Sequence, residues 1–269
     1  MMELFENDLR DNGRMSSKGN QLKWQYMGYW HKADYLGYEG LSEYICSEML
    51  AFSDLVKEEF TLYQTEEISY KKSVFKGCSS KDFLPEGWQM ITLERLFKTR
   101  YGRSLGAGVY GLREIKDRLR FLVEEVEKVT GIKDFGIYMN RLMTIDALFL
   151  NEDRHTHNIA LLLDTEGRFH TCPIFDLGAS LLSDMTLDYP MGEDVYELMD
   201  TVKSKTICDS FYDSLTVSEE LYGENLHFSF DYRDIKECLD REPYYPADQK
   251  ERVLHVLLEQ RRKYSYLFR

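Results

Sequence analysis

The segment NEDRHTHN at residues 151–158 constrains the fold more than any other, because it places charged and imidazole groups between two apolar runs. The run LMTIDALFL precedes the segment and the run IALLL follows it, and both have the composition of buried elements. Charged groups in such a position are either solvated in a turn or used together at a site. Three interpretations are open at this point: a transition-metal site, a solvated turn and a catalytic loop.

A metal site is suggested by His155 and His157, because alternate residues of a strand point to the same side. Arg154, however, would place a cation beside the metal, and Cys172 is too isolated to complete a set of ligands. The pattern therefore disfavours a transition-metal site, and the solvated turn remains the simpler alternative.

The residues that follow favour a catalytic loop. Asp153 and Asn158 are five positions apart, which is the spacing between the base and the metal-binding Asn of kinase catalytic loops. A predicted hairpin turns at residues 165–167, and the sequence FDLG at 175–178 then places Asp176 in a one-residue variant of D-F-G. Phosphoryl transfer needs a carboxylate that orients the attacking hydroxyl, together with an Asn and a second carboxylate that hold Mg²⁺. Asp153, Asn158 and Asp176, in this order along the chain, are the predicted groups.

The wider patterns predict a small mixed lobe followed by a larger helical lobe. In the first 95 residues, β-prone runs surround one apolar helix at 41–55. Further along, the segment 112–131 has apolar residues at spacings of three and four and ends in Gly131. We therefore predict an α+β, bilobal fold of the protein-kinase type, with a β-rich N-lobe at residues 1–92 and a mostly helical C-lobe at 93–269.

The charge balance excludes some classes of partner. A formal charge of −13 and a pI near 5.0 argue against a general nucleic-acid binder, which needs clustered Lys and Arg. The 5 cysteines are odd in number and form no C-x-x-C, and no basic leader or run of about 18 apolar residues is visible. These features predict a reduced, cytoplasmic protein without direct nucleic-acid or membrane partners.

The residues of the loop and of the segment after it resemble those of the HipA-like serine/threonine kinases of bacteria. The loop D-x-H-x-x-N (Asp153, His155, Asn158) and the segment Pro-x-Phe-Asp that ends in Asp176 are similar to the family's catalytic and metal-binding segments. The resemblance covers most of residues 14–180. It implies that Asp153 is the base, that His155 is a positioning residue, and that Asn158 and Asp176 hold Mg²⁺ beside ATP.

The same resemblance extends to the first hundred residues. The stretch SSKGNQLKW is similar to the family's phosphate-covering loop, so backbone groups at Gly19, Asn20 and Gln21 are expected to hold phosphate oxygens. The stretch GYWHKADYLGYEGLSEY is similar to the strand and helix that carry the family's phosphate-binding lysine and its partner. Lys32 is therefore expected to meet the α and β phosphates, oriented by Glu43.

Glu39 and Glu48 remain alternatives to Glu43 as the partner of the lysine. Lys18 and Lys23 are either electrostatic helpers of the phosphate loop or solvated lysines. The partner of Arg154 stays open between Asp176, Asp153 and water.

Two further expectations concern the nucleotide and its regulation. Backbone groups near Met90 and Ile91 are expected to meet the adenine ring. Members of the HipA-like family can phosphorylate themselves in the phosphate loop, and Ser16 is the best match for that serine. A phosphate at Ser16 would repel those of ATP.

The resemblance implies ATP- and Mg²⁺-dependent phosphoryl transfer to serine or threonine hydroxyls of a protein, with an antitoxin-like regulator as a further partner. The chain resembles the kinase core without the family's extra N-terminal β-rich segment, which weakens the expectation of a toxin. Phosphatidylinositol-kinase-like or small-molecule transfer and a nucleotide-binding pseudokinase remain alternatives. The last ninety residues match no motif, and we expect substrate recognition there.

A second glycine-rich stretch, GAGVYG at 106–111, matches G-x-G-x-x-G letter for letter. The nucleotide fingerprint requires a strand before the glycines, whereas LERLFKTRYG before this stretch is predicted to be helical. We therefore interpret it as a flexible connection within the larger lobe.

Overall fold

The computed structural model describes residues 1–10 and 21–269, which form two compact units. Unit 1 comprises Met1–Asp82, Phe175–Val202 and His227–Arg269, and unit 2 comprises Phe83–Ile174 and Lys203–Leu226. Both units are built from segments that are discontinuous in the sequence, whereas the predicted lobes were continuous. The lobe boundary after residue 92 stays a prediction.

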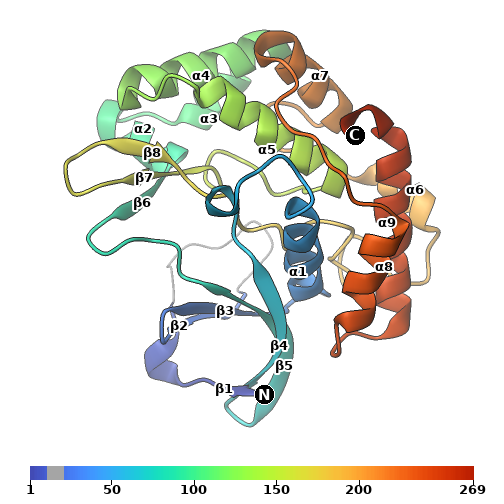
Figure 1. The fold of residues 1–269 in the computed structure, drawn as a ribbon. Coiled ribbons are helices and arrows are strands. Elements are labelled where there is room, and N and C mark those ends of the chain that lie inside the picture. The colour runs from blue at the N-terminus through green and yellow to red at the C-terminus, as the bar shows by residue number, and fades with distance from the viewer. Residues whose placement is uncertain (11–20) are drawn as a thin grey trace. The chain divides into compact units, whose positions relative to one another are not determined.

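Unit 1 combines a curled sheet with helices from both ends of the sequence (Figure 1). Within the described residues the sheet has the strand order β1-β4-β5-β3-β2, in which the neighbouring strands are antiparallel except for the parallel pair β1 and β4. The elements of the unit are β1 (Met2–Glu3), η1 (Glu6–Asp8), β2 (Lys23–Tyr26), β3 (Tyr29–Ala33), α1 (Glu39–Leu50), η2 (Lys57–Glu59), β4 (Tyr63–Tyr70), β5 (Ser73–Lys81), α6 (Val195–Thr201), α8 (Tyr232–Arg241), α9 (Ala247–Lys263) and η3 (Ser265–Leu267).

The hairpin of β2 and β3 places two lysines side by side. Its two-residue turn, Met27 and Gly28, has backbone φ angles of 48° and 78°, the left-handed conformation that matches the twist of such hairpins. The resulting register pairs Lys23 with Lys32. Because paired residues of neighbouring strands share a face of the sheet, both lysines lie on one face.

The two faces of this sheet have different roles. Trp24 and Ala33 belong to a buried apolar cluster on one face, together with Leu4, Ile68 and Tyr70. Side chains alternate along a strand, so Lys32 points to the opposite face, where α1 packs against β4 and β5. The apolar composition of α1 agrees with its position, because ten of its residues are buried.

Two glycines allow α1, β5 and β3 to lie close together. A Cβ on Gly40, in the first turn of α1, would lie 2.5 Å from the backbone of Gly77 on β5. A Cβ on Gly77 would lie 2.0 Å from the carbonyl oxygen of Lys32. The close approach brings the next turn of α1, which carries Glu43, toward β3.

Unit 2 is mostly helical, with a three-stranded sheet of order β6-β7-β8. Its elements are β6 (Gln89–Thr92), α2 (Leu93–Tyr101), α3 (Leu105–Tyr110), α4 (Ile115–Thr130), α5 (Phe135–Phe149), β7 (Ala160–Leu163), β8 (Phe169–Thr171) and α7 (Phe211–Tyr222). Helix α7 packs against α4 and α5, and α3 packs against α2 and α4. The glycine-rich stretch GAGVYG forms α3, so the expectation of a flexible connection was wrong.

The predicted order of helix, loop and hairpin is present in unit 2. Helix α4 ends at Gly131, whose φ of 77° is the left-handed conformation that ends helices. Helix α5 is almost entirely buried and ends at Leu150, also left-handed with a φ of 54°. The chain then makes the loop at 151–158 and continues into β7 and β8. The expected mixed α+β architecture is confirmed.

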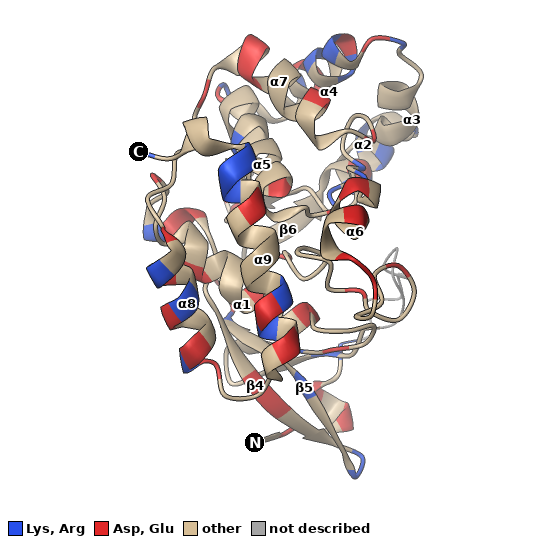
Figure 2. Ribbon diagram, turned by 90° about the vertical axis from the view of Figure 1, so that its right-hand side faces the viewer, with Lys and Arg blue, Asp and Glu red and all other residues tan. Residues whose placement is uncertain are grey.

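Charged residues of both signs alternate along α8 and α9 in unit 1 (Figure 2). Neighbouring residues on these helices form ion pairs, among them Lys236 with Asp240 and Arg262 with Glu259. The basic residues of α8 and α9 are therefore interspersed with acidic ones. Of the helices that the structure describes, none combines the length and the apolar character needed to span a membrane.

We expect Gly77→Ala to lower the free energy of unfolding by about 1–3 kcal/mol, because the new methyl group would collide with the backbone of β3. Gly192→Ala is the matched control, since nothing lies within 4 Å of its Cβ position. Urea unfolding of both variants gives the comparison. Equal stability of the two variants would contradict the close approach.

Candidate functional site

Lys32, Glu43 and Asp176 form a compact ionic cluster in unit 1. Lys32 Nζ donates to Glu43 Oε1 at 2.5 Å and to Asp176 Oδ1 at 2.6 Å. The side chains of Lys32 and Glu43 are 8% and 2% exposed, whereas that of Asp176 is 33% exposed. The structure thus brings together three residues that were singled out separately in the sequence, and Asp176 is the member most accessible from solvent.

The backbone around Asp176 is fixed by the same cluster. Leu177 N donates to Glu43 Oε2 at 2.8 Å, so both oxygens of the Glu43 carboxylate have hydrogen-bond donors. Asp176 has a φ of 62°, a left-handed conformation that non-glycine residues adopt infrequently and that clusters at functional sites. Glu43 therefore positions both Lys32 and the segment that carries Asp176.

The electrostatics of the cluster favour a charged lysine. Burial opposes the charged form of Lys32, but the carboxylates of Asp176 and Glu43 outweigh it and hold the pKa of Lys32 well above its usual value. Burial raises the pKa of Glu43, and Lys32 opposes that rise. Lys23 Nζ lies 4.0 Å from Asp176 Oδ1, so a second cation from the sheet reaches the same carboxylate.

The alternatives to Glu43 have other partners. Glu39 accepts hydrogen bonds from the backbone N–H groups of Leu36 at 2.7 Å and Gly37 at 3.1 Å, and so fixes the loop before α1. Glu48 pairs with Arg241 of α8 at 3.2 Å. Of the three acidic candidates on α1, the described contacts join only Glu43 to Lys32.

In unit 2, the loop at 151–158 brings Asp153 and Asn158 together. Asn158 Nδ2 donates at 2.8 Å to both the backbone carbonyl and the carboxylate Oδ2 of Asp153. No described hydrogen bond involves Asn158 Oδ1, which is the atom that a metal ion would require. Lys205 Nζ lies 4.0 Å from Asp153 Oδ1, so a cation accompanies the predicted base.

His155 lies beside the predicted base. Its Nε2 is 3.6 Å from Asp153 Oδ1, beyond a normal hydrogen bond. Burial lowers the pKa of His155, Asp153 opposes this change, and His157 and Lys205 add to it. A neutral imidazole is therefore favoured near pH 7, which suits a positioning residue.

A buried ion pair determines the shape of this loop. Arg154 Nε lies 3.2 Å from each carboxylate oxygen of Asp146 on α5, and both side chains are 3% exposed. Asn151 Nδ2 donates to Asp146 Oδ1 at 2.7 Å, and Thr206 Oγ1 donates to the Arg154 carbonyl at 2.7 Å. Arg154, whose partner the sequence left open, thus links the loop to the helix before it.

A second contact ties the loop to α2 and α3. Thr156 Oγ1 donates to Glu94 Oε2 at 3.0 Å, and Gly106 N donates to the same oxygen at 3.0 Å. The hydroxyl of Ser104 and these two donors lower the pKa of Glu94 although burial opposes this change. Gly106, the first glycine of GAGVYG, therefore supports the loop at 151–158 indirectly, because it binds the same Glu94 carboxylate as Thr156.

The remaining predicted site residues lie elsewhere. Ser16, Gly19 and Asn20 fall outside the described residues, and Gln21 is half-buried just before β2. Met90 and Ile91 lie on β6 of unit 2, where they pair with Leu162 and Leu161 of β7. The structure assigns Lys32 to unit 1 and Met90 and Ile91 to unit 2, so their role at adenine stays a prediction.

Sequence reasoning missed three residues around these clusters: Asp34, Tyr63 and Asp146. Tyr63 of β4 places its ring 5.1 Å from Lys32 Nζ, and its hydroxyl accepts a hydrogen bond from Asp176 N at 3.4 Å. Asp146 had a usable signal, because a lone carboxylate in the apolar run LMTIDALFL requires a buried partner. Tyr63 had no comparable signal.

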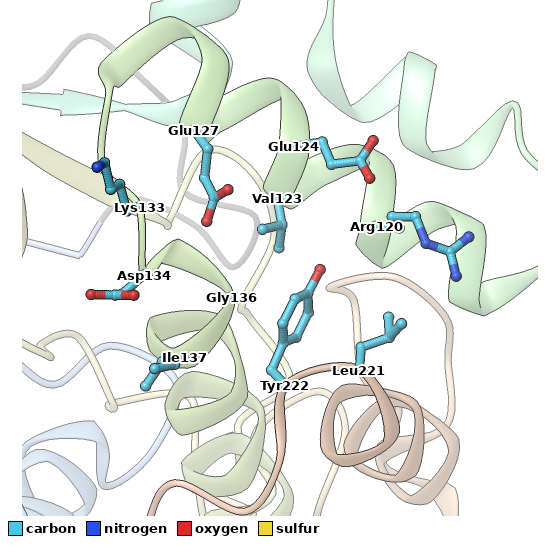
Figure 3. Close-up of a pocket in the computed structure, with 10 residues that line it drawn as sticks. All are labelled: Arg120, Val123, Glu124, Glu127, Lys133, Asp134, Gly136, Ile137, Leu221 and Tyr222. Carbon is cyan, nitrogen blue, oxygen red and sulfur yellow. The ribbon is translucent and has the colours of Figure 1, made fainter.

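Unit 2 also has a pocket of about 420 Å³ between α4, the start of α5 and the end of α7 (Figure 3). Figure 3 shows the Tyr222 side chain rising from α7 toward α4. Gly136 makes room for the ring, since a Cβ there would lie 2.4 Å from it. The residues that line this pocket do not include the predicted site residues.

Asp34, in the loop between β3 and α1, has an unusual carboxyl group. Gly40 N donates to its Oδ1 at 2.7 Å. Burial, followed by the nearby Glu39, raises the pKa of Asp34 from 3.8 to about 7, although the hydrogen bonds from Tyr245 and Gly40 oppose this rise. The group is therefore close to its titration point at neutral pH.

Loss of one partner of the buried pair should be costly. We expect Asp146→Ala to lower the free energy of unfolding by about 3–5 kcal/mol, because it leaves the Arg154 charge buried without its carboxylate. The control, Glu220→Ala, removes the exposed pair with Lys116 and should cost under about 1 kcal/mol. Similar costs in the two variants would refute the structural role of Asp146.

The titration of Asp34 should make stability depend on pH. The folded protein binds this proton more tightly than the unfolded chain, because the pKa of the carboxyl is about 7 in the folded protein and near 3.8 in the unfolded chain. The proton therefore stabilises the folded state fully below about pH 4, and this stabilisation is lost as the pH rises to about 7. Asp34→Asn should flatten this part of the dependence. Denaturant unfolding at pH 4.5 and 7.5 measures it, and an unchanged slope in the variant would contradict the assignment.

No protein-family model matches the chain, and no curated protein sequence matches it. Among solved structures, it is similar to a Helicobacter pylori proinflammatory kinase, CtkA, with a TM-score of 0.63, 17% sequence identity, and coverage of 97% of this chain and 94% of that one. A second similar structure is HipA of Shewanella oneidensis MR-1 in a toxin–antitoxin complex with HipB and operator DNA, with a TM-score of 0.45, 13% identity, and coverage of 94% and 66%. The predicted kinase-like fold is confirmed by the first of these structures.

Proposed function

We propose that the protein is a kinase that transfers the γ-phosphoryl group of ATP, with Mg²⁺, to serine or threonine hydroxyls of a protein. The ionic cluster of Lys32, Glu43 and Asp176 carries the proposal. Burying the charges of Lys32 and Glu43 is costly, and kinases use a lysine, its glutamate partner and an accessible aspartate of this kind to hold phosphates and metal. The fold shared with a bacterial kinase supports the same conclusion.

The donor set fits Mg²⁺. With Lys32 charged, the three-residue cluster has one carboxylate in excess, and Asp176 is its most exposed member. Mg²⁺ prefers oxygen ligands, and we assign Asp176 Oδ and Asn158 Oδ1 as the protein's ligands. When bound, the ion neutralises charge on the phosphate oxygens of ATP.

Lys32 would meet the α and β phosphates, after exchanging Asp176 for them, and Glu43 would keep its ammonium group in place. Lys23 adds a second cation to the same face of the sheet. The raised pKa of Lys32 favours this role, because the lysine then carries its charge at neutral pH.

Asp153 would accept or orient the proton of the attacking hydroxyl. Asn158 holds one oxygen of its carboxylate, which fixes the side chain for that task. His155 supports the loop as a neutral residue. A binding module that only holds nucleotide has no need of Asp153, so turnover separates the kinase from the pseudokinase alternative.

The proposal names a protein as the acceptor. We extend it to self-phosphorylation at Ser16, which lies outside the described residues, with loss of ATP affinity through charge repulsion. An antitoxin-like regulator and a cytoplasmic location stay predictions. Phosphatidylinositol or a small molecule as acceptor is the alternative.

We expect wild-type protein incubated with Mg·ATP to gain the mass of one phosphate, mapped to Ser16 or nearby. Asp153→Ala should lose at least about 100-fold in rate, because it lacks the group that orients the hydroxyl. It should still bind Mg·ATP. Intact-mass spectrometry over time and calorimetric titration provide the two measurements.

Asp209→Ala is the matched control, since it removes an exposed carboxylate that pairs only loosely with Lys203, at 3.7 Å. It should phosphorylate at the wild-type rate. Equal rates in Asp153→Ala and the control would refute the role of Asp153. If wild type transfers phosphate to phosphatidylinositol but never to protein, the alternative acceptor class is correct. Failure of the wild type to bind Mg·ATP would refute the nucleotide assignment itself.

A further inference from the structure

Helix α1 is held at its N-terminus by a residue of the loop between α8 and α9. Tyr245 Oη donates to Asp34 Oδ2 at 2.7 Å, while Gly40 N donates to Asp34 Oδ1 at 2.7 Å. Asp34 directly follows β3, the strand that carries Lys32. One carboxylate therefore connects the end of that strand, the first turn of α1 and a segment more than 200 residues away along the chain.

The loop presents the Tyr245 hydroxyl in a fixed position. Tyr245 is 5% exposed, and Glu242 accepts hydrogen bonds from Tyr244 N at 2.6 Å and from Tyr245 N at 2.9 Å. Glu242 is itself 3% exposed and pairs with Lys250 of α9 at 3.0 Å. The turn is thus built around a buried carboxylate and a lysine, and α9 anchors it.

The packing around the hydroxyl is close. A Cβ on Gly40 would lie 2.6 Å from Tyr245 Oη, so the glycine admits the tyrosine to the helix terminus. Lys76 of β5 places its Nζ 5.3 Å from the centre of the Tyr245 ring. The tyrosine therefore contacts α1, Asp34 and the sheet at one place.

Other contacts hold a different part of α1. Tyr44 Oη donates to the Cys238 carbonyl of α8 at 3.1 Å, and Arg241 pairs with Glu48 near the end of the helix. The first turn of α1 contains Gly40, and Glu43 follows Gly40 by three residues. Among the described contacts, that of Tyr245 with Asp34 connects the loop between α8 and α9 to this first turn.

We propose that Tyr245 is a positioning residue of the nucleotide site, which fixes the first turn of α1 through Asp34 and so holds Glu43 against Lys32. The inference rests on the proposed kinase function and adds to it a role for the C-terminal segment. Without the hydroxyl, the buried Asp34 carboxylate loses one of its two donors, and the first turn of α1 loses its link to the loop. Lys32 is then less well oriented toward phosphates.

The test is Tyr245→Phe, which removes only the hydroxyl. We expect its affinity for Mg·ATP, measured by calorimetry, to fall about fivefold, the effect expected for the loss of one ordinary hydrogen bond. Its affinity for adenosine, which has no phosphates for Lys32 to hold, should stay at the wild-type value. Amide hydrogen exchange at residues 40–44 should become faster.

Two controls separate positioning from general destabilisation. Thr144→Val removes a buried hydroxyl that donates to the Asn140 carbonyl at 2.9 Å in unit 2, and it should leave affinity for Mg·ATP and exchange in α1 unchanged. In a Glu43→Gln background, Tyr245→Phe should have no further effect on Mg·ATP, because the tyrosine acts through Glu43. Asp34→Asn should retain affinity that Asp34→Ala loses, since the amide oxygen can accept from Gly40 N and the amide NH2 can donate to Tyr245 Oη.

The outcomes are distinct. Unchanged affinity of Tyr245→Phe for Mg·ATP, or an equal loss for Mg·ATP and adenosine, would refute the positioning role. A full additional loss in the Glu43→Gln background would refute the route through Glu43. A wild type that binds neither compound contradicts the proposed function, and unchanged hydrogen exchange at residues 40–44 in Tyr245→Phe would then refute the link to α1 by itself.

Discussion

The buried pair of Lys32 and Glu43 is the interaction on which unit 1 depends. Removing two charges from water costs several kcal/mol for each ion, and a pair recovers this only when its remaining hydrogen-bonding capacity is also satisfied. Here the lysine has a second carboxylate in Asp176, and the glutamate has a second donor in Leu177 N. The close contacts at Gly40 and Gly77 bring α1 and the strands together around this pair. The contact of Tyr245 with Asp34 joins the same region to the loop between α8 and α9.

Unit 2 uses the same device for a different purpose. Asp146 and Arg154 are buried together, and the loop that they stabilise leaves Asp153 and Asn158 partly exposed. A charge pair thus provides rigidity, while neighbouring polar groups remain available for chemistry. Precise placement by a buried support is what a catalytic loop requires, because misplacement of a base by about 1 Å costs much of its effect.

Much of the fold followed from local patterns in the sequence. The spacing of apolar residues and the final Gly131 predicted α4. The order of α5, loop and hairpin was visible because apolar residues recur with different periods in helices and in strands. Glu43 was singled out among three candidates, although spacing alone left the choice open. The contacts between Lys32, Glu43 and Asp176 agree with that choice, while the roles of these residues stay predictions.

The features that escaped prediction depend on contacts distant in sequence. The partner of Arg154 lies on the preceding helix, and only the buried position of Asp146 reveals it. Asp34 and Tyr245 have ordinary local contexts, and no periodicity connects them. The division into discontinuous units has the same origin, because it reflects which segments pack together and not where patterns change.

The discontinuity of unit 1 has a consequence for the protein during its synthesis. Its sheet, α1 and Lys32 are translated early, Asp176 follows much later, and His227–Arg269 comes last. Because domains fold as their segments become available, a nascent chain holds the sheet with an incomplete set of partners for α1. The contact of Tyr245 with Asp34 therefore forms only after residue 245 has emerged, long after Lys32 and Glu43. The nucleotide site that we propose is complete only once this segment has been synthesised.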